Sequence, residues 1–132
     1  MLFTTKTEYG LRAMKALAKN KGKKPLPLAQ IAKQEHISLS YLEQIIAKLK
    51  ADNLVRGAKG VSGGYVLERP AKNISMFEIV EALEGPLAIF YCLSENQKKI
   101  TCNGDCLTKK VWQELQRNII HTLRKFKLAD LI

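Results

Sequence analysis

The sequence contains no long hydrophobic run, and this absence excludes membrane-spanning proteins. None of its apolar stretches approaches the roughly 18 residues that cross a membrane, and residues 1–6 lack the long apolar core of a secretory signal peptide. Hydrophobic residues still make up 46% of the 132 residues, which suits one domain with a modest core. We therefore expect a cytoplasmic protein that has no membrane partner.

The sequence also lacks the motifs by which common enzyme classes are recognised. It contains no phosphate-binding loop, no catalytic triad and no paired acid–base motif. Neither of its two histidines, His36 and His121, is adjacent to a cysteine that it could activate as a base. We therefore expect a protein that is not an enzyme.

Cysteine is scarce and confined to one stretch, which we call the cysteine segment (92–106). Nine residues separate Cys92 from Cys102, and three separate Cys102 from Cys106. Three thiols cannot all pair into disulfides, whereas thiolates are ligands for zinc, copper(I) and iron–sulfur clusters. The cysteines alone are compatible with an iron–sulfur or soft-metal site, a structural zinc knuckle, or a few buried thiols.

Acidic residues are few compared with basic ones. The chain has 12 Asp and Glu against 22 Lys and Arg, a formal net charge of +10. Residues 1–70 hold 13 of the basic residues but only 5 of the acidic ones. Such a positive half favours a phosphate-backbone partner, although a solvated lysine-rich surface would have the same composition. No basic helix has the broad apolar face of a membrane-surface helix.

The first half reads as a helix-turn-helix. Apolar spacing predicts a helix over 5–19 and a short helix from Leu28 to near His36. A further helix is predicted to begin at Ser40, where Glu43 three residues on would complete a capping box, and to end at residues 52–53. Two short helices with a tight connector are typical of this motif.

A β-hairpin follows the helix-turn-helix. Residues 54–56 and 65–67 are strand-like, and the glycine-rich stretch between them supplies permissive backbone. A hairpin in this position indicates the wing of a winged helix. We expect residues 1–70 to form a winged helix-turn-helix DNA-binding domain.

The second half is predicted to be helical apart from the cysteine segment. Ser75 and Glu78 form a capping box that opens a helix, and Gly85 with Pro86 ends it. A final helix of roughly 20 residues runs from Leu107 to residues 125–127, and its apolar stripe is broader than a small core needs. We interpret it as a dimerisation helix, with simple core packing as the alternative. The predicted fold is mainly α with a small β-hairpin wing and a long C-terminal dimerisation helix. Residues 71–132 are expected to form a second part of the chain, which holds the cysteine segment and this helix.

In a helix-turn-helix, the N-terminal part of the second helix enters the major groove of DNA. Gln44 is suited to adenine and Glu43 to cytosine, the serines to bases or phosphate, and Lys48 to phosphate. Cations among the wing glycines can approach the minor groove or the phosphates. The alternatives are that Ser40 and Glu43 only cap the helix and that the wing is an ordinary turn. The predicted DNA contacts are Ser38, Ser40, Tyr41, Glu43, Gln44, Lys48, Arg56, Lys59 and Gly60.

Four stretches carry a resemblance to a known family. They are residues 28–31, 37–44, 63–65 and the run Cys106-Leu107-Thr108 ahead of Trp112. The sequence resembles, over nearly its whole length, the bacterial winged-helix regulators of the iron–sulfur cluster assembly regulator (IscR) and nitric-oxide-sensing repressor (NsrR) type. The resemblance implies a homodimer on a double-stranded DNA operator. It also implies a 2Fe–2S or 4Fe–4S cluster whose loss or redox change alters DNA affinity.

The resemblance implies a ligand set for the cluster. Family members supply three cysteines from this loop, which match Cys92, Cys102 and Cys106, although here the first gap is longer and the second shorter. Assembly regulators place a histidine three residues after the last cysteine, where this chain has Lys109, and a protonated lysine cannot ligate iron. The nitric-oxide-sensing branch instead takes a carboxylate from the first helix of the partner subunit, which corresponds here to Glu8.

Other assignments remain open. Glu8 lies in the first turn of a helix, where a carboxylate also favours the helix dipole. His36 and His121 are competing nitrogen ligands. The alternative function is a winged-helix regulator that uses its three cysteines for zinc binding or thiol redox sensing without a cluster.

Overall fold

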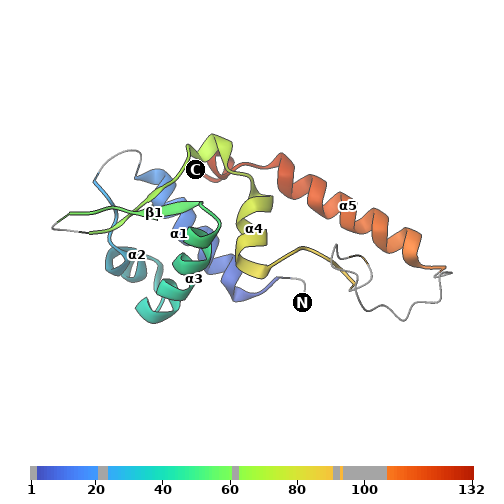
Figure 1. Ribbon diagram of the computed structural model, residues 1–132, viewed down its shortest axis with the longest axis horizontal. Coiled ribbons are helices and arrows are strands. Elements are labelled where there is room, and N and C mark those ends of the chain that lie inside the picture. The colour runs from blue at the N-terminus through green and yellow to red at the C-terminus, as the bar shows by residue number, and fades with distance from the viewer. Residues whose placement is uncertain (1–2, 21–23, 61–62, 91–92, 94–106) are drawn as a thin grey trace.

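The computed structural model describes residues 3–20, 24–60, 63–90, 93 and 107–132 (Figure 1). It confirms the predicted mainly helical fold with a β-hairpin wing and a long C-terminal helix. The elements are α1 (Thr5–Lys19), α2 (Leu28–Glu35), α3 (Leu39–Ala51), β1 (Val55–Gly57), β2 (Tyr65–Leu67), η1 (Ala71–Asn73), α4 (Met76–Glu84), α5 (Lys109–Lys125) and η3 (Leu128–Leu131). No helix in these ranges is long and apolar enough to cross a membrane.

One hydrophobic core joins α1, α2, α3 and α4. Its fully buried side chains include Met14, Ile31, Leu42, Ile45, Ile46, Leu49, Ile79 and Leu83. Helices α1 and α4 are in close contact at Gly10, where an added Cβ would overlap the side chain of Leu83. The predicted domain boundary at residue 70 stays a prediction, and α4, which follows it, shares this core with α1 and α3.

The predicted start of α3 was wrong. Ser38, in extended conformation, is the N-cap, and its Oγ accepts a hydrogen bond from the Tyr41 amide at 3.3 Å. Ser40 and Glu43 lie inside the helix with exposed side chains and form no capping box. The earlier start follows from the tight connector, because His36 ends α2 in the left-handed region with φ 55°. The capping box of Ser75 and Glu78 at the start of α4 is confirmed.

The wing is a short antiparallel hairpin in which Arg56 pairs with Val66. The first strand runs one residue later than predicted, over Val55–Gly57, and the second as predicted. Tyr65 also exchanges two backbone hydrogen bonds with Leu26, which fixes the hairpin to the segment before α2. Beside it Gly64 has φ 124°, and a Cβ there would lie 2.8 Å from the backbone of Pro25, so only glycine fits.

Helix α5 extends away from the winged domain (Figure 1). It begins at Lys109, two residues after the predicted start, and none of its 17 residues is buried by the described part of the chain. Its C-terminal end is fixed by two backbone hydrogen bonds, from Met76 to Phe126 at 2.9 Å and from Leu128 to Ile74 at 2.8 Å. The fully buried Leu128 opens the turn η3, which was not predicted.

Candidate DNA interface and cluster-ligand residues

Four of the predicted DNA contacts share one solvent-facing side of α3. Ser40, Glu43, Gln44 and Lys48 are all exposed, and their spacing of three and four residues places them along one helix face. The opposite side of α3 is buried in the core. We call these four residues the reading face. A helix with one face packed in the core and polar side chains on the opposite face can enter a major groove.

Tyr41 and Ser38 stand apart from the reading face. Tyr41 is half-buried and turned toward α1, where its hydroxyl shares a hydrogen bond with Oγ1 of Thr5 at 3.1 Å. Its ring meets the Tyr9 ring edge-on, with centroids 5.7 Å apart and planes at 87°. Ser38 caps the helix. Contacts of these two residues with DNA stay predictions, and both also have a structural role at the start of α3.

The described part of the wing lies at the same end of the molecule as α2 (Figure 1). Arg56, Lys59 and Gly60 are exposed. A hydrogen bond from the Ala58 amide to the Gly64 carbonyl, 2.9 Å long, joins the two arms of the hairpin beyond the paired strands. Residues 61 and 62 at the tip lie outside the described residues. Cations on a narrow projection are suited to phosphates beside the groove that α3 enters.

Glu8 lies exposed in the first turn of α1. Its Oε1 accepts hydrogen bonds from Nη2 of Arg12 at 2.9 Å and from Nε at 3.1 Å. The side chain remains 61% exposed and that of Arg12 43% exposed. The Arg12 guanidinium also lies over the Tyr9 ring, 5.4 Å from its centroid. The predicted ligand is therefore accessible from outside the subunit and is held by one cation.

Glu84 at the end of α4 ties down the start of α1. Its Oε1 accepts hydrogen bonds from the Thr4 amide at 2.9 Å, Thr4 Oγ1 at 2.6 Å and Thr7 Oγ1 at 2.8 Å. Burial raises the pKa of Glu84, but these hydrogen bonds outweigh it and leave the pKa below its ordinary value. Sequence reasoning missed this contact because its partners lie 77 and 80 residues apart. The contact sets Glu8's helix beside the point where the chain leaves α4 toward the cysteine segment.

The predicted thiol ligands Cys92, Cys102 and Cys106 lie outside the described residues. Within the described ranges, no group of three or more His, Cys, Asp or Glu is placed to hold a metal. Three thiolates and one carboxylate are a donor set that suits iron in a cluster. The competing histidines lie apart from each other, with His36 at the end of α2 and His121 exposed on α5.

Described residues just before the cysteine segment and near its start contact α5. The Gln116 side chain accepts a hydrogen bond from the Ile89 amide at 3.0 Å and donates one to the Leu93 carbonyl at 3.3 Å. Phe90 packs edge-on against Trp112 with centroids 5.2 Å apart. The chain entering the segment therefore runs beside α5, the helix that the chain forms on leaving it.

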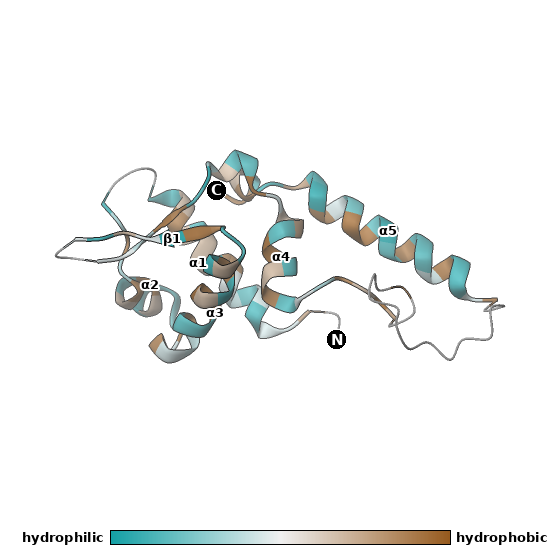
Figure 2. Ribbon diagram, viewed as in Figure 1, coloured by the Kyte–Doolittle hydropathy of each residue, from teal (hydrophilic) through white to brown (hydrophobic). Residues whose placement is uncertain are grey.

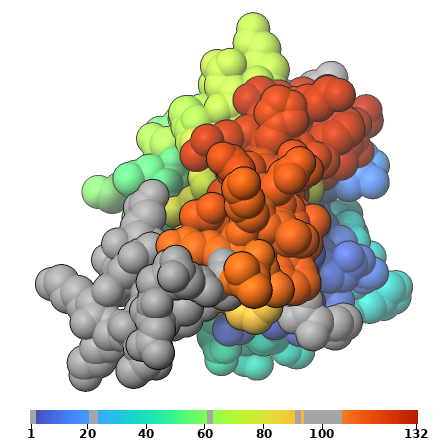
Figure 3. Space-filling view, turned by 90° about the vertical axis from the view of Figure 1, so that its right-hand side faces the viewer, coloured from blue at the N-terminus to red at the C-terminus, as the bar shows by residue number. Residues whose placement is uncertain are grey.

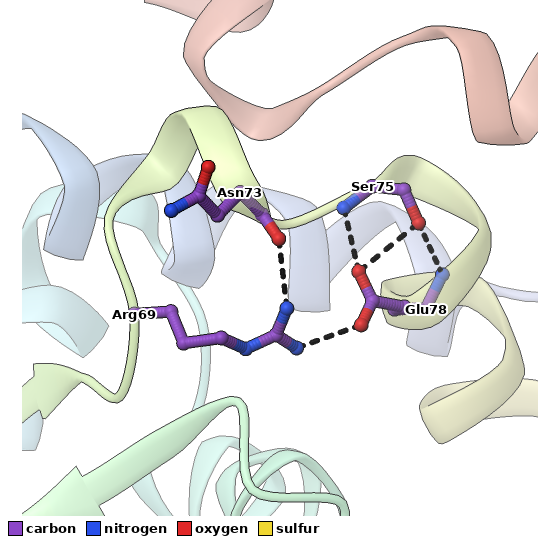
Figure 4. A network of polar contacts seen from close by, with 4 residues as sticks. All are labelled: Arg69, Asn73, Ser75 and Glu78. Carbon is purple, nitrogen blue, oxygen red and sulfur yellow. Dashed lines mark hydrogen bonds and ion pairs between the residues drawn. The ribbon is translucent and has the colours of Figure 1, made fainter.

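A polar network joins the end of the wing to the start of α4 (Figure 4). Arg69 donates to Oε1 of Glu78 and to the carbonyl of Asn73, both at 2.7 Å. Oε2 of Glu78 accepts from the amide of Ser75 at 2.8 Å. Burial raises the pKa of Glu78, but the hydrogen bond and charge of Arg69 and the bonds from Ser75 outweigh it and leave the pKa below its ordinary value. The network fixes the segment after the wing, although sequence reasoning found only its capping box.

Comparisons with known proteins agree with this architecture. The Rrf2 family model, described as an iron-dependent transcriptional regulator, matches residues 3–132. The HTH-type transcriptional regulator IscR of Sodalis glossinidius is 36% identical over 134 residues, covering 100% of this chain and 79% of that protein.

Two solved structures are similar over almost the whole chain. CymR, the global cysteine regulator of B. subtilis, has a TM-score of 0.83 and 30% identity, covering 99% of this chain and 95% of that one. IscR of T. potens has a TM-score of 0.79 and 34% identity, covering 99% of this chain and 85% of that one. The fold is thus shared by an IscR and by a protein described as a global cysteine regulator.

Proposed function

Because this chain belongs to the Rrf2 family of DNA-binding transcriptional regulators, we propose that it is a homodimer whose operator affinity is switched by an iron–sulfur cluster. The resemblance inferred from the sequence is confirmed at the level of the family. The observation that carries the DNA-binding part is the reading face, which α3 presents from a rigid core. We place this activity in the cytoplasm, on chromosomal DNA, and assign the chain no catalytic role.

The reading face supports specific readout of an operator. Gln44 can bond an adenine through two hydrogen bonds and Glu43 can accept one from cytosine, while Ser40 suits either a base or a phosphate. Lys48 and the wing residues Arg56 and Lys59 would neutralise phosphates, which adds affinity without sequence preference. Readout thus comes from α3, and most of the salt-dependent affinity comes from the cations around it.

The apolar strip of α5 supports the homodimer. Figure 2 shows hydrophobic and hydrophilic residues alternating along this helix, and Figure 3 shows α5, in orange and red, at the front of the face that is turned toward the viewer. Leu107, in the turn before α5, and Val111 and Leu115, within it, follow at four-residue spacing and are 95%, 59% and 42% exposed. A second copy of the same strip is the partner that would cover it symmetrically. Such a dimer would place two α3 helices on two operator half-sites.

Four protein ligands would hold the cluster: Cys92, Cys102 and Cys106 of one subunit and Glu8 of the partner subunit. Such a cluster supplies a centre that changes redox state and reacts with nitric oxide. A carboxylate binds iron more weakly than a thiolate does. The bond between Glu8 and iron is therefore the one that a signal would break first. Its exposure at the start of α1, beside the end of α4, supports a role for it between subunits.

Similarity to CymR favours a second candidate function. CymR is described as a global cysteine regulator, and another solved structure that matches this chain is an oxidised form of Staphylococcus aureus CymR. In this alternative the cysteines sense thiol redox state or bind zinc, and no cluster forms.

Anaerobic purification separates the two candidates. We expect a coloured protein with visible charge-transfer bands, stoichiometric iron and sulfide, and a Mössbauer spectrum that assigns 2Fe–2S or 4Fe–4S. Removal of the cluster should change the Kd for an operator selected from random DNA. A colourless protein whose operator affinity follows thiol oxidation or zinc would replace the cluster proposal with the alternative.

The Glu8 assignment has its own test. Glu8→Ala should retain a cluster on three thiolates but lose the dependence of operator affinity on redox state or nitric oxide. The measurement is operator Kd by fluorescence anisotropy, with and without nitric oxide, beside visible absorption of the same sample. A response equal to that of the wild type would remove Glu8 from the ligand set.

A further inference from the structure

We propose that Tyr9 and Arg12 are positioning residues that couple the state of Glu8 to the start of α3. This inference rests on the proposed function, because it concerns how an event at the cluster reaches the reading face. It assigns roles to two side chains of α1 that are themselves neither predicted cluster ligands nor predicted DNA contacts.

The coupling is a continuous series of side-chain contacts. Glu8 holds the Arg12 guanidinium through two hydrogen bonds, at 2.9 and 3.1 Å. That guanidinium lies 5.4 Å from the centroid of the Tyr9 ring. The Tyr9 ring meets Tyr41 edge-on at 5.7 Å, and Tyr41 shares a hydrogen bond with Thr5. The series begins at the predicted ligand and ends in the first turn of α3.

Tyr41 is placed to pass a displacement to the reading face. It directly follows Ser40, and its amide donates to the Ser38 Oγ that caps the helix. The Leu42 amide donates to the Ser38 carbonyl. Because base contacts depend on sub-ångström placement of hydrogen-bonding groups, a small movement of this turn changes how Ser40 and Gln44 meet the bases.

In the proposed dimer, the Glu8 carboxylate would have two competing partners, Arg12 of its own subunit and the iron held by the other subunit. Both hydrogen bonds from Arg12 go to Oε1, so a carboxylate drawn to iron on the partner subunit weakens or loses this pair. Released Arg12 keeps only its contact with the Tyr9 ring and changes the charge beside the tyrosine pair. The cluster-bound and cluster-free states therefore differ in what holds Tyr9.

The hydrogen bonds that Glu84 accepts from the start of α1 restrict movement of this helix as a whole. A change at Glu8 is therefore expected to move side chains of α1 rather than its backbone. Thr4 and Thr7 tie the first turn of α1 to the end of α4 through three hydrogen bonds. Gly10, in the next turn, packs against Leu83 with no room for a Cβ. Because the backbone of α1 is held in this way, binding of Glu8 to iron would change mainly the positions of the Arg12 and Tyr9 side chains.

The test compares substitutions along the series with matched controls. Tyr9→Leu removes the aromatic contact, and Tyr9→Phe keeps it. Arg12→Gln removes the ion pair, and Lys15→Gln removes an exposed cation from another part of α1. Operator Kd is measured for each full-length protein with and without its cluster, and amide hydrogen exchange is measured in the cluster-free proteins. Thermal unfolding identifies any variant that fails to fold.

We expect Tyr9→Leu to speed exchange of the Tyr41 and Leu42 amides by about two- to tenfold, the range set by one aromatic pair. The ratio of operator Kd between cluster-free and cluster-bound protein should fall toward one in Tyr9→Leu and in Arg12→Gln. Tyr9→Phe and Lys15→Gln should match the wild type in both measurements.

The failures of the two proposals are distinguishable. A wild-type protein without a cluster, or with the same operator Kd in both states, contradicts the proposed function before any variant is considered. A wild type that switches, with Tyr9→Leu and Arg12→Gln switching to the same extent and unchanged exchange at Tyr41, overturns the coupling alone. In that case Glu8 and Arg12 form only an exposed helix pair, which changes an equilibrium constant by about twofold.

Discussion

At the residue scale, Ser38 and Ser40 show how two identical side chains two positions apart have different roles. Ser38 closes the start of α3, with its Oγ on the Tyr41 amide, whereas Ser40 is exposed within the helix on the reading face. Sequence reasoning exchanged the capping role between them because both fit the pattern of an N-cap. The connector decided the outcome, since the chain leaves α2 through His36 at φ 55° and is extended at Ser38.

This difference predicts that the two alanine substitutions affect different properties of the protein. Ser38→Ala should lower the free energy of unfolding by about 1 kcal/mol through loss of the cap. Ser40→Ala should leave unfolding within about 0.5 kcal/mol of the wild type and reduce operator affinity. Chemical denaturation and fluorescence anisotropy on the same samples give both quantities. Equal destabilisation by the two substitutions would mean that Ser40 shares in capping.

At the element scale, α3 is expected to supply the sequence specificity of DNA binding, and the wing is expected to supply affinity that does not depend on sequence. Gln44→Ala should relax preference at one base pair by ~1–3 kcal/mol, because a paired amide is removed from a base edge. Lys59→Ala should weaken all sequences alike and reduce the slope of log K against log salt by about one. Binding to operator and random duplexes across a salt series separates the two. Equal losses on both duplexes for both variants would contradict the assignment.

The network at the end of the wing makes stability depend on pH. The pKa of Glu78 lies below its ordinary value in the folded chain, despite burial that raises it, because Arg69 and Ser75 stabilise the carboxylate. The stabilisation is therefore complete above the unfolded-state pKa and is lost as pH falls through the lower folded-state pKa. Glu78→Gln keeps the capping geometry but removes the charge, so stability should fall less steeply as the pH is lowered through the acidic range.

Unfolding measured from pH 6 to 3 tests this, with Glu114→Gln on the exposed side of α5 as the control. The contribution of Glu84, whose pKa is also lowered, should remain in both variants. A wild-type acid slope in Glu78→Gln would show that the ion pair with Arg69 is unimportant for stability.

Local patterns predicted most elements, and tertiary contacts decided the rest. Helical spacing located α1 over 5–19, and turn and cap residues located β2 and the start of α4. The turn η3 has no such local pattern, because it exists through Leu128 filling the core and bonding to Ile74. The Glu84 anchor is hidden for the same reason. The reading face could be predicted because helix periodicity alone places its residues together.

At the scale of the whole molecule, α5 connects the winged domain to a second copy in the proposed dimer. The end of this helix is fixed to the segment after the wing through Phe126 and Leu128. The segment is in turn held by the Arg69–Glu78 network. The angle at which two α5 helices pack would therefore set the separation of the two wings and of the two reading faces. The geometry of the dimer would then determine the spacing of the two operator half-sites that it can bind.

A charge placed in the apolar strip of α5 should separate the subunits. Leu115→Asp puts one carboxylate from each copy into the proposed interface, and each lost leucine removes about 1.5–3 kcal/mol of burial. Two copies together should weaken dimerisation by more than 100-fold, or about 3 kcal/mol. Gln113→Asp adds the same charge to the same helix about 200° away from Leu115's side of it, so it should remain dimeric.

Sedimentation velocity across a concentration series measures the change. Operator affinity should fall with the loss of dimer in Leu115→Asp, because a monomer occupies only one half-site, while binding to random DNA falls much less. The winged domain should stay folded, since Leu115 is not part of its core. A Leu115→Asp protein that remains dimeric and binds the operator normally would place the dimer interface elsewhere and leave the strip of α5 for another partner.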